Sequence, residues 1–112
     1  DGVVEMNGEQ TIFLNEKISN QLNGIALVWS YYDIKTYQAL NSGVHVQFIP
    51  KWCVQNMNGA GHAFVDPYRH IDKYFYVYDD KIVGNNINGT SGTEGGISYN
   101  NYNCVLRAVI GV

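Results

Sequence analysis

Residues 24 to 33 read GIALVWSYYD, an apolar run that ends in two tyrosines and a carboxylate. Successive side chains of a strand point to opposite faces, so Ile25, Leu27, Trp29 and Tyr31 share one face. These bulky side chains predict a core face, with Trp29 in the core and Tyr31 at its rim. The alternate positions are small but uncharged as far as residue 30. We therefore expect the strand to be covered on both sides, the second cover coming from another copy of the chain.

The same alternation recurs along the chain. It appears in VHVQFIP (residues 44–50), in KYFYVYD (73–79) and in YNCVLRAVIGV (102–112). Thirteen Asn and twelve Gly, against two Pro, supply the residues of tight turns. EKISNQL (16–22) is the only helix candidate, and it is too short. Eight or nine short strands without a helix predict an all-β fold, a small antiparallel sandwich or barrel formed by residues 1–112 as one domain.

Local signals predict how neighbouring strands connect. Asn7-Gly8 is typical of a tight hairpin turn, so residues 3–14 are expected to form a hairpin. Residues 51–55, KWCVQ, are expected to resume the strand that precedes them. Residues 97–112 are expected to form the final hairpin of the fold.

The last strand presents a cation among apolar residues. By parity, Cys104, Leu106, Ala108 and Ile110 share one face, and Arg107 belongs to the other. Two explanations remain open for Arg107. Its head group can extend into solvent while its stem covers apolar surface, or it can contact a carboxylate or carbonyl at a subunit interface.

Composition excludes several classes of function. The chain has 112 residues, a net charge of -3 and 15% charged residues. Nucleic-acid binding relies on clustered Lys and Arg, so it is not expected. Membrane insertion is not expected either, because no window holds the roughly 18 consecutive apolar residues of a membrane span. The chain starts at Asp1 without an initiator Met, so we expect it to be a fragment of a longer protein.

Candidate chemistry is sparse. His62, Asp66 and His70 are four residues apart and would converge as metal ligands on a helix. The segment reads as a strand, which holds His62 and Asp66 roughly 13 Å apart at about 3.3 Å per residue. No metal site or cofactor is therefore predicted. No nucleophile or phosphate-loop motif is present, so the chain is not predicted to be an enzyme.

Cys53 and Cys104 lie in apolar strand-like segments. They could form a disulfide, but buried free thiols are favoured because a free Cys behaves as a small hydrophobe. Asn88-Gly89-Thr90 matches the N-glycosylation sequon. In the absence of any sign of secretion, we interpret that match as coincidence.

Four segments in a fixed order resemble a known family: LNEKISNQLNGIALVWSYYD (14–33), FIPKW (48–52), KYFYVYDDKIVGNN (73–86) and GGISYNNYNCVLRAVIGV (95–112). They are similar to the C-terminal domain of tail-fibre, baseplate or receptor-binding proteins of phages and prophages of Gram-positive bacteria. The resemblance covers nearly the whole chain and supplies no catalytic residues. It implies a homotrimeric β-sandwich or barrel head at the tail tip of the virion. Folding in the reducing bacterial cytoplasm would keep both thiols free.

The resemblance also implies a function, which is non-covalent binding of a host cell-wall polysaccharide or teichoic-acid glycan. The alternative is a structural domain without a ligand, which trimerises or caps a baseplate. Other tail or baseplate proteins are expected partners in both cases. The least patterned segments, residues 33–43 and 56–72, together with loop 84–96, are expected to face the host.

The expected binding chemistry is aromatic stacking on sugar rings, supported by hydrogen bonds from Asn, Asp, His and Tyr. Tyr74, Tyr76 and Tyr78 form a stripe that could stack on sugars, although such stripes more often pack beneath neighbouring structure. The residues expected nearest to the ligand lie in or beside the loops: Tyr32, Asp33, Tyr37, Trp52, His62, Tyr68, Arg69 and His70.

Overall fold

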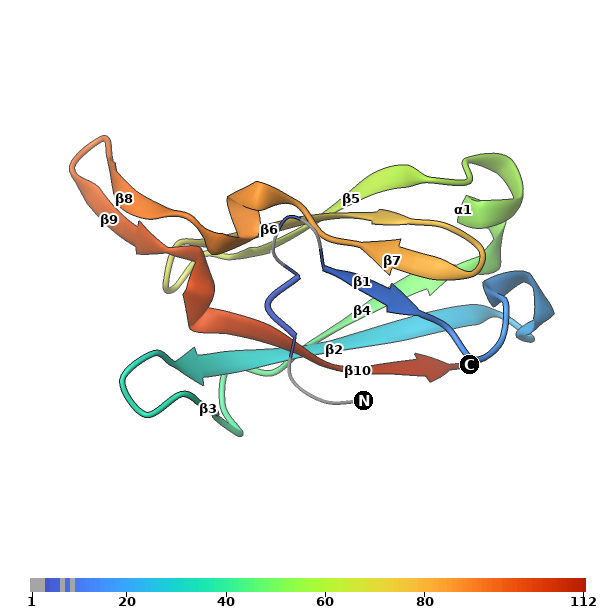
Figure 1. Cartoon of the computed structure of the whole chain (residues 1–112), viewed down its shortest axis with the longest axis horizontal. Helices are drawn as coiled ribbons and strands as arrows, with labels where there is room; N and C mark the ends of the chain where they lie inside the picture. Colours follow the sequence, from blue (N-terminus) through green and yellow to red (C-terminus); the bar gives the residue numbers. More distant parts are fainter. Residues whose placement is uncertain (1–3, 7, 9) are drawn as a thin grey trace.

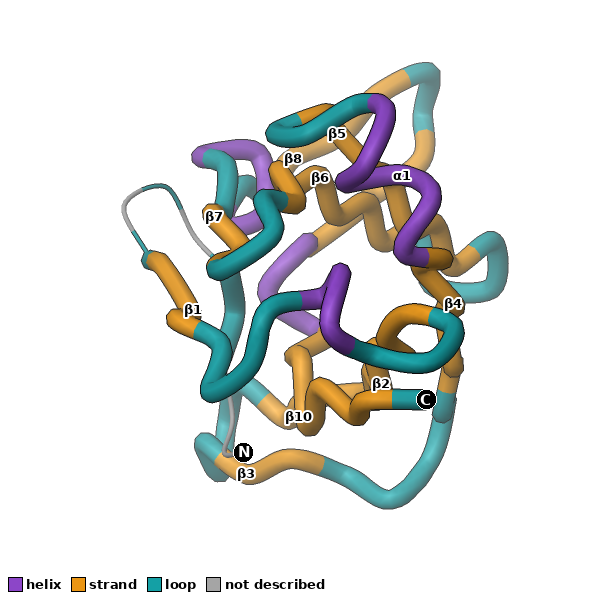
Figure 2. The backbone as a smooth tube through the Cα atoms, turned by 90° about the vertical axis from the view of Figure 1, so that its right-hand side faces the viewer, coloured by secondary structure: helices purple, strands orange, loops and turns teal. Residues whose placement is uncertain are grey.

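The alternating segments form two four-stranded antiparallel sheets, packed face to face, in the computed structural model of the chain, and a separate two-stranded hairpin extends from them (Figure 1). The structure describes residues 4–6, 8 and 10–112. Figure 2, viewed along the longest axis, shows the two layers. The strands are β1 (Thr11–Phe13), β2 (Gly24–Asp33), β3 (Gln38–Ala39), β4 (His45–Pro50), β5 (Ala60–Asp66), β6 (Ile71–Val77), β7 (Lys81–Val83), β8 (Ser91–Glu94), β9 (Ile97–Asn100) and β10 (Cys104–Gly111). The helical turns are η1 (Ile18–Asn20), α1 (Lys51–Asn56), η2 (Asn86–Gly89) and η3 (Asn101–Asn103). The predicted all-β sandwich is confirmed.

The first sheet is centred on β2, the strand formed by GIALVWSYYD. β10 pairs along one edge of β2, while β4 and then β3 pair along the other edge. Ile25, Leu27 and Trp29 are buried as predicted, and Tyr31 is half-buried at the rim. This sheet therefore provides one wall of the core.

The second sheet has the strand order β1-β7-β6-β5. The inward residues of β6 include Phe75 and are buried, whereas Tyr74, Tyr76 and Tyr78 lie on the outer side. The sheets meet at Trp29, whose ring centroid lies 5.1 Å from that of Phe64 and 5.6 Å from that of Phe75. Both periodic patterns thus converge on one aromatic core.

The segment KWCVQ does not resume a strand, contrary to the prediction. It forms most of the six-residue helix α1, and Val54 is the residue that this helix buries. Pro50, in an extended conformation, precedes the first helical residue. Five residues are too few for periodicity to separate a strand from a single helical turn, so the local pattern was ambiguous.

Both predicted terminal hairpins are wrong in their pairing. Val4 bridges Leu106 of β10, while β1 pairs with β7; Asn7, in the predicted turn, lies outside the described residues, as do Glu9 and residues 1–3. At the other end, β9 pairs with β8 and β10 pairs with β2. β1 and β10 thus pair with strands that are distant in the sequence, whereas β9 pairs with the strand that precedes it.

Arg107 interrupts the parity of β10, because the register against β2 shifts between Leu106 and Ala108. Cys104 and Leu106 face the core as predicted, but Ala108 and Ile110 change to the outer face. The guanidinium of Arg107 donates to Ser30 Oγ at 3.0 Å, to the Leu40 carbonyl at 3.2 Å and to Asn41 Oδ1 at 3.3 Å. It therefore contacts a carbonyl, but within its own chain.

Two buried polar side chains tie the N-terminal segment to the core. Lys73 is 1% exposed, and its Nζ donates to the carbonyls of Glu5 and Asn88 at 3.0 Å each. Asn88 is fully buried, and its amide donates to the carbonyls of Met6 and Tyr74. The sequon asparagine thus has a structural role and is inaccessible in the folded chain.

Both cysteines are free. Cys104 is buried, and burial raises the pKa of its thiol to about 12.

Candidate functional site

One end of the sandwich gathers the turn after β2, the turn after β5, the β8–β9 hairpin and η3 (Figure 1). We refer to it as the loop end. Two hollows open there, one lined by tyrosines and one by carboxylates. Both adjoin η3, since Tyr102 lines the first and Asn101 the second.

The tyrosine hollow has a volume of about 300 Å³. It is lined by Glu5, Tyr32, Ile34, Tyr37, Asn100 and Tyr102. Tyr37 is 77% exposed, so one aromatic ring stands open to solvent. The hollow therefore combines three aromatic rings with a carboxylate and an amide.

A tight turn after β2 positions Tyr37. The Asp33 carboxylate accepts hydrogen bonds from the backbone N–H of Lys35 at 2.8 Å and of Thr36 at 3.4 Å. The Tyr37 N–H donates to the Asp33 carbonyl at 2.8 Å, and Tyr37 itself adopts a positive φ of 58°. The hydrogen bond from Lys35 is the main cause that lowers the pKa of Asp33. Asp33 therefore shapes the turn with its carboxylate.

The opposite wall of the tyrosine hollow comes from η3. Asn100 precedes this turn, and its side-chain oxygen accepts a hydrogen bond from the Tyr102 N–H at 3.0 Å. This Asn cap fixes the start of the turn and places Tyr102 opposite the turn that carries Tyr37. Residues some 65 positions apart in the sequence thus line one hollow.

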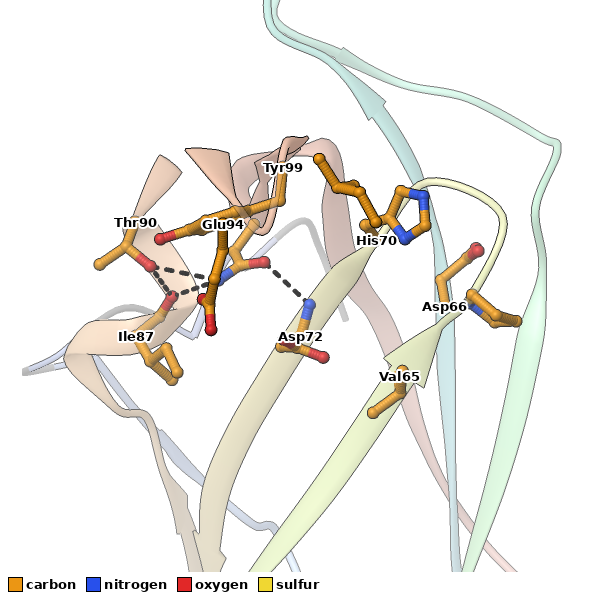
Figure 3. Close-up of a pocket in the computed structure, with 11 residues that line it drawn as sticks. Val65, Asp66, His70, Asp72, Ile87, Thr90, Glu94 and Tyr99 are labelled. Carbon is orange, nitrogen blue, oxygen red and sulfur yellow. Dashed lines mark hydrogen bonds between the residues drawn. The ribbon is translucent and has the colours of Figure 1, made fainter. Parts of the chain in front are cut away.

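The carboxylate-lined hollow measures about 380 Å³ and is shown in Figure 3. Asp66 and His70 lie on the side of the β5–β6 turn, whereas Glu94 and Tyr99 come from the β8–β9 hairpin. The side chain of Asn101 bridges the two sides. It accepts from the Asp72 N–H at 2.8 Å and donates to the Ile87 carbonyl at 2.8 Å. The lining holds three carboxylates and neither Lys nor Arg.

Asp66 organises the β5–β6 turn. It is fully buried and accepts from the backbone N–H groups of Tyr68 at 2.8 Å and Arg69 at 3.2 Å, while His45 Nε2 lies 3.2 Å from its other oxygen. Burial alone would raise the pKa of Asp66, but hydrogen bonds from the Tyr31 hydroxyl, these amides and His45 outweigh burial and lower it. Asp66 is therefore a structural carboxylate.

The rest of the turn is exposed. The guanidinium carbon of Arg69 lies 4.1 Å from the centroid of the Tyr31 ring, a cation–π contact between the two sheets. Tyr68 is 87% exposed, and His70 adopts a positive φ of 55° while lining the carboxylate hollow. The turn thus offers one open aromatic ring and one imidazole to solvent.

Six of the eight residues predicted near the ligand lie at the loop end: Tyr32, Asp33, Tyr37, Tyr68, Arg69 and His70. Trp52 does not, because it belongs to α1 beside the start of β2, and the ten residues of β2 span roughly 30 Å. His62 does not either. It stacks on Phe75 at 6.0 Å between ring centroids, and burial lowers its pKa.

Sequence reasoning missed most of the lining of these hollows, since only Tyr32, Tyr37 and His70 of their lining residues were in the predicted set. Glu5, Asn100 and Tyr102 in the first hollow, and Asp72 and Glu94 in the second, were outside the predicted set. The Asn- and Tyr-rich stretch YNNYN (99–103) was a usable signal, because Asn caps turns and Tyr favours recognition surfaces. The family resemblance had instead treated this stretch as framework.

Among the described residues, no group of three His, Cys, Asp or Glu side chains could hold a metal ion, and no helix is long and apolar enough to cross a membrane. Comparison with protein-family models, with curated proteins and with solved structures gave no match.

Proposed function

We propose that this chain is the receptor-binding head of a phage tail protein, and that it holds a host cell-wall glycan non-covalently at the loop end. The observation that carries the proposal is the tyrosine hollow, in which Tyr32, Tyr37 and Tyr102 meet Asn100 and Glu5. The family resemblance of the sequence supports the same role. The proposal places the domain on the virion, at the tail tip or baseplate.

The chemistry of the tyrosine hollow suits a sugar. Aromatic faces pack against the C–H side of a pyranose, and each tyrosine adds a hydroxyl that can exchange hydrogen bonds at the rim. The Glu5 carboxylate can accept from sugar hydroxyls, and the Asn100 amide nitrogen can donate to them. A volume of about 300 Å³ holds only part of a chain of sugars. Because the hollow is open to solvent, the rest of a polymer can extend beyond it.

Carboxylates outnumber the two cations of the loop end, Lys35 and Arg69, and this balance favours a neutral polysaccharide over a phosphate-rich teichoic acid. Glu5 lies in the tyrosine hollow, and Asp72 and Glu94 are exposed carboxylates of the neighbouring hollow. Like charges within about 10 Å repel at low ionic strength, and such repulsion discriminates between ligands. The proposed ligand is therefore a neutral cell-wall polysaccharide.

The test uses the double variant Tyr32→Ala with Tyr37→Ala, and Trp52→Ala as a matched control. Trp52 is also an exposed aromatic residue, at 57%, but it lies at the other end of β2. Loss of two stacking contacts should weaken binding by about tenfold or more. Binding is measured against immobilised cell-wall fractions of Gram-positive bacteria, with the neutral polysaccharide and the teichoic acid presented separately.

We expect retention on the neutral fraction, loss in the double variant and no change in Trp52→Ala. A folded double variant that binds as tightly as the unmodified chain would refute the site. A chain that binds none of the fractions would favour the structural alternative, a trimerising or baseplate-capping domain. Release of reducing sugar ends would instead indicate a depolymerase.

A further inference from the structure

The outer face of the first sheet consists of apolar side chains from three strands. Register places Phe48, Ala26 and Ile110 in one row across the sheet, and Val46, Val28 and Ala108 in the next. Val44 and Val112 extend this face along β4 and β10. We refer to these eight residues as the aliphatic face.

The aliphatic face is open in the single chain. Five of its side chains keep much of their surface in solvent: Val44 56%, Val46 66%, Phe48 53%, Ile110 49% and Val112 40%. Together they expose on the order of 400 Å², a size at which apolar patches on soluble monomers commonly mark interaction sites. The strand that contributes most, β4, pairs only with β2 in the described part of the chain. An uncharged edge strand of this kind is normally protected.

The chain already covers the other half of this sheet surface. The segment after β3 folds back, with the Leu40 N–H bonded to the Tyr31 carbonyl and the Tyr31 N–H bonded to the Ser42 carbonyl. Beneath it, Ser30 and Val105 are 1% and 0% exposed. The open half therefore begins where the chain's own cover ends.

We propose that a second copy of this chain covers the aliphatic face. The face lacks charged groups, so a charged partner would find no complementary group on it, whereas a copy brings an equally uncharged surface. The shape of the face also favours a second copy of the chain, because the small side chain of Ala26 leaves a depression between the large side chains of Phe48 and Ile110. Phe48 of one copy can pack over Ala26 of the other.

The exposed patch is smaller than the about 800 Å² per partner of a standard stable interface. Half-buried members of the face and its rim must supply the remainder, so the association depends on concentration. This inference rests on the aliphatic face alone and not on the glycan proposed at the loop end. Its failure and the failure of the glycan proposal are therefore separately observable.

The test compares Val46→Lys with Val65→Lys by sedimentation velocity of the 112-residue chain, over a range that reaches about 100 µM. The two positions match closely, since both are valines on the outer side of an edge strand, 66% and 57% exposed. We expect the unmodified chain and Val65→Lys to associate alike. Val46→Lys should weaken association by more than about a hundredfold, because it buries an unpaired ammonium group. The mass of the complex gives the number of copies.

Circular dichroism establishes that each variant is folded. If Val46→Lys does not fold, Val46→Thr replaces it, since Thr keeps the shape of Val and adds a buried hydroxyl; its expected effect is about tenfold. An unmodified chain that stays monomeric at the highest concentration overturns the proposal. So does a folded variant at position 46 that associates as well as the unmodified chain, or a Val65→Lys variant that dissociates equally.

Discussion

The two sheets of this sandwich have similar inner faces and opposite outer faces. Inside, Trp29 of the first sheet packs against Phe64 and Phe75 of the second. Outside, the second sheet presents Tyr74 and Tyr76, whose rings meet edge to face at 5.5 Å, together with charged neighbours. The first sheet presents the aliphatic face.

The two outer faces differ in how well they tolerate contact with water. Tyrosine has a polar hydroxyl at the end of an apolar ring, and the Tyr76 hydroxyl accepts a hydrogen bond from Asn85 Nδ2 at 3.1 Å. Lys81 also lies over the Tyr78 ring at 5.0 Å. Such a surface is compatible with water. The aliphatic face has no comparable polar groups, which is why we propose a partner for it and none for the tyrosine stripe.

The largest expected effect tests whether the two sheets share one core. Trp29→Ala removes a fully buried ring that contacts both Phe64 and Phe75. It should lower the free energy of unfolding by about 3–5 kcal/mol, through lost burial and the cavity left behind. Urea denaturation monitored by circular dichroism measures this change.

The control is Trp52→Ala, which removes the same type of ring from an exposed position on α1. It should change the free energy of unfolding by less than about 0.5 kcal/mol. Equal losses in the two variants would mean that burial at the sheet interface does not set stability. The comparison between inner and outer faces would then fail.

A smaller effect is expected where the segment after β3 covers the outer side of the first sheet. Arg107→Met removes the guanidinium that donates to Ser30, Leu40 and Asn41 but keeps an apolar stem. Because Arg107 is only half-buried, we expect a loss of about 1–2 kcal/mol in the free energy of unfolding. Urea denaturation against Lys35→Met, an exposed cation in the turn before β3, provides the comparison. Equal stability of the two variants would show that Arg107 does not hold this cover in place.

The sequence predicted the strands better than their partners. Parity correctly assigned Trp29 to the core and Tyr74, Tyr76 and Tyr78 to one face, because each judgement needs only neighbouring residues. The pairing of β1 with β7 depends on residues about 70 positions apart, and no local turn signal encodes it. The bulge at Arg107 has the same origin, since its side chain reaches Leu40.

The candidate site was predicted in part for a similar reason. The transition from patterned strand to unpatterned loop at Tyr32 marked one end of the molecule. It could not show that Trp52, equally close to a loop, lies at the other end of β2. Nor could it reveal Tyr102, which reaches the tyrosine hollow only through the fold of η3.

The smallest expected effect is a pH dependence that arises from the interior side of the second sheet. Burial lowers the pKa of Lys73 from its ordinary value of 10.5 to about 8. Between these values the unfolded chain holds a proton that the folded chain has lost, so stability rises with pH. Burial raises the pKa of Cys104 from 9.0 to about 12, which makes stability fall with pH above 9. The two contributions oppose each other from pH 9 to 10.5.

The interval from pH 8 to 9 therefore reports mainly Lys73, because Cys104 of the unfolded chain is at most half ionised there. There the free energy of unfolding should rise by about 1 kcal/mol, since full titration gives 1.36 kcal/mol per pH unit at most. Urea denaturation at pH 7.5, 8 and 9 measures it, and Lys73→Met should show no rise across the same interval. Cys104→Ala should keep this rise and extend it toward pH 10.5. A rise that persists in Lys73→Met would assign the titration to another group. Lys73, on the inner side of the second sheet, would then not be the cause of the pH dependence.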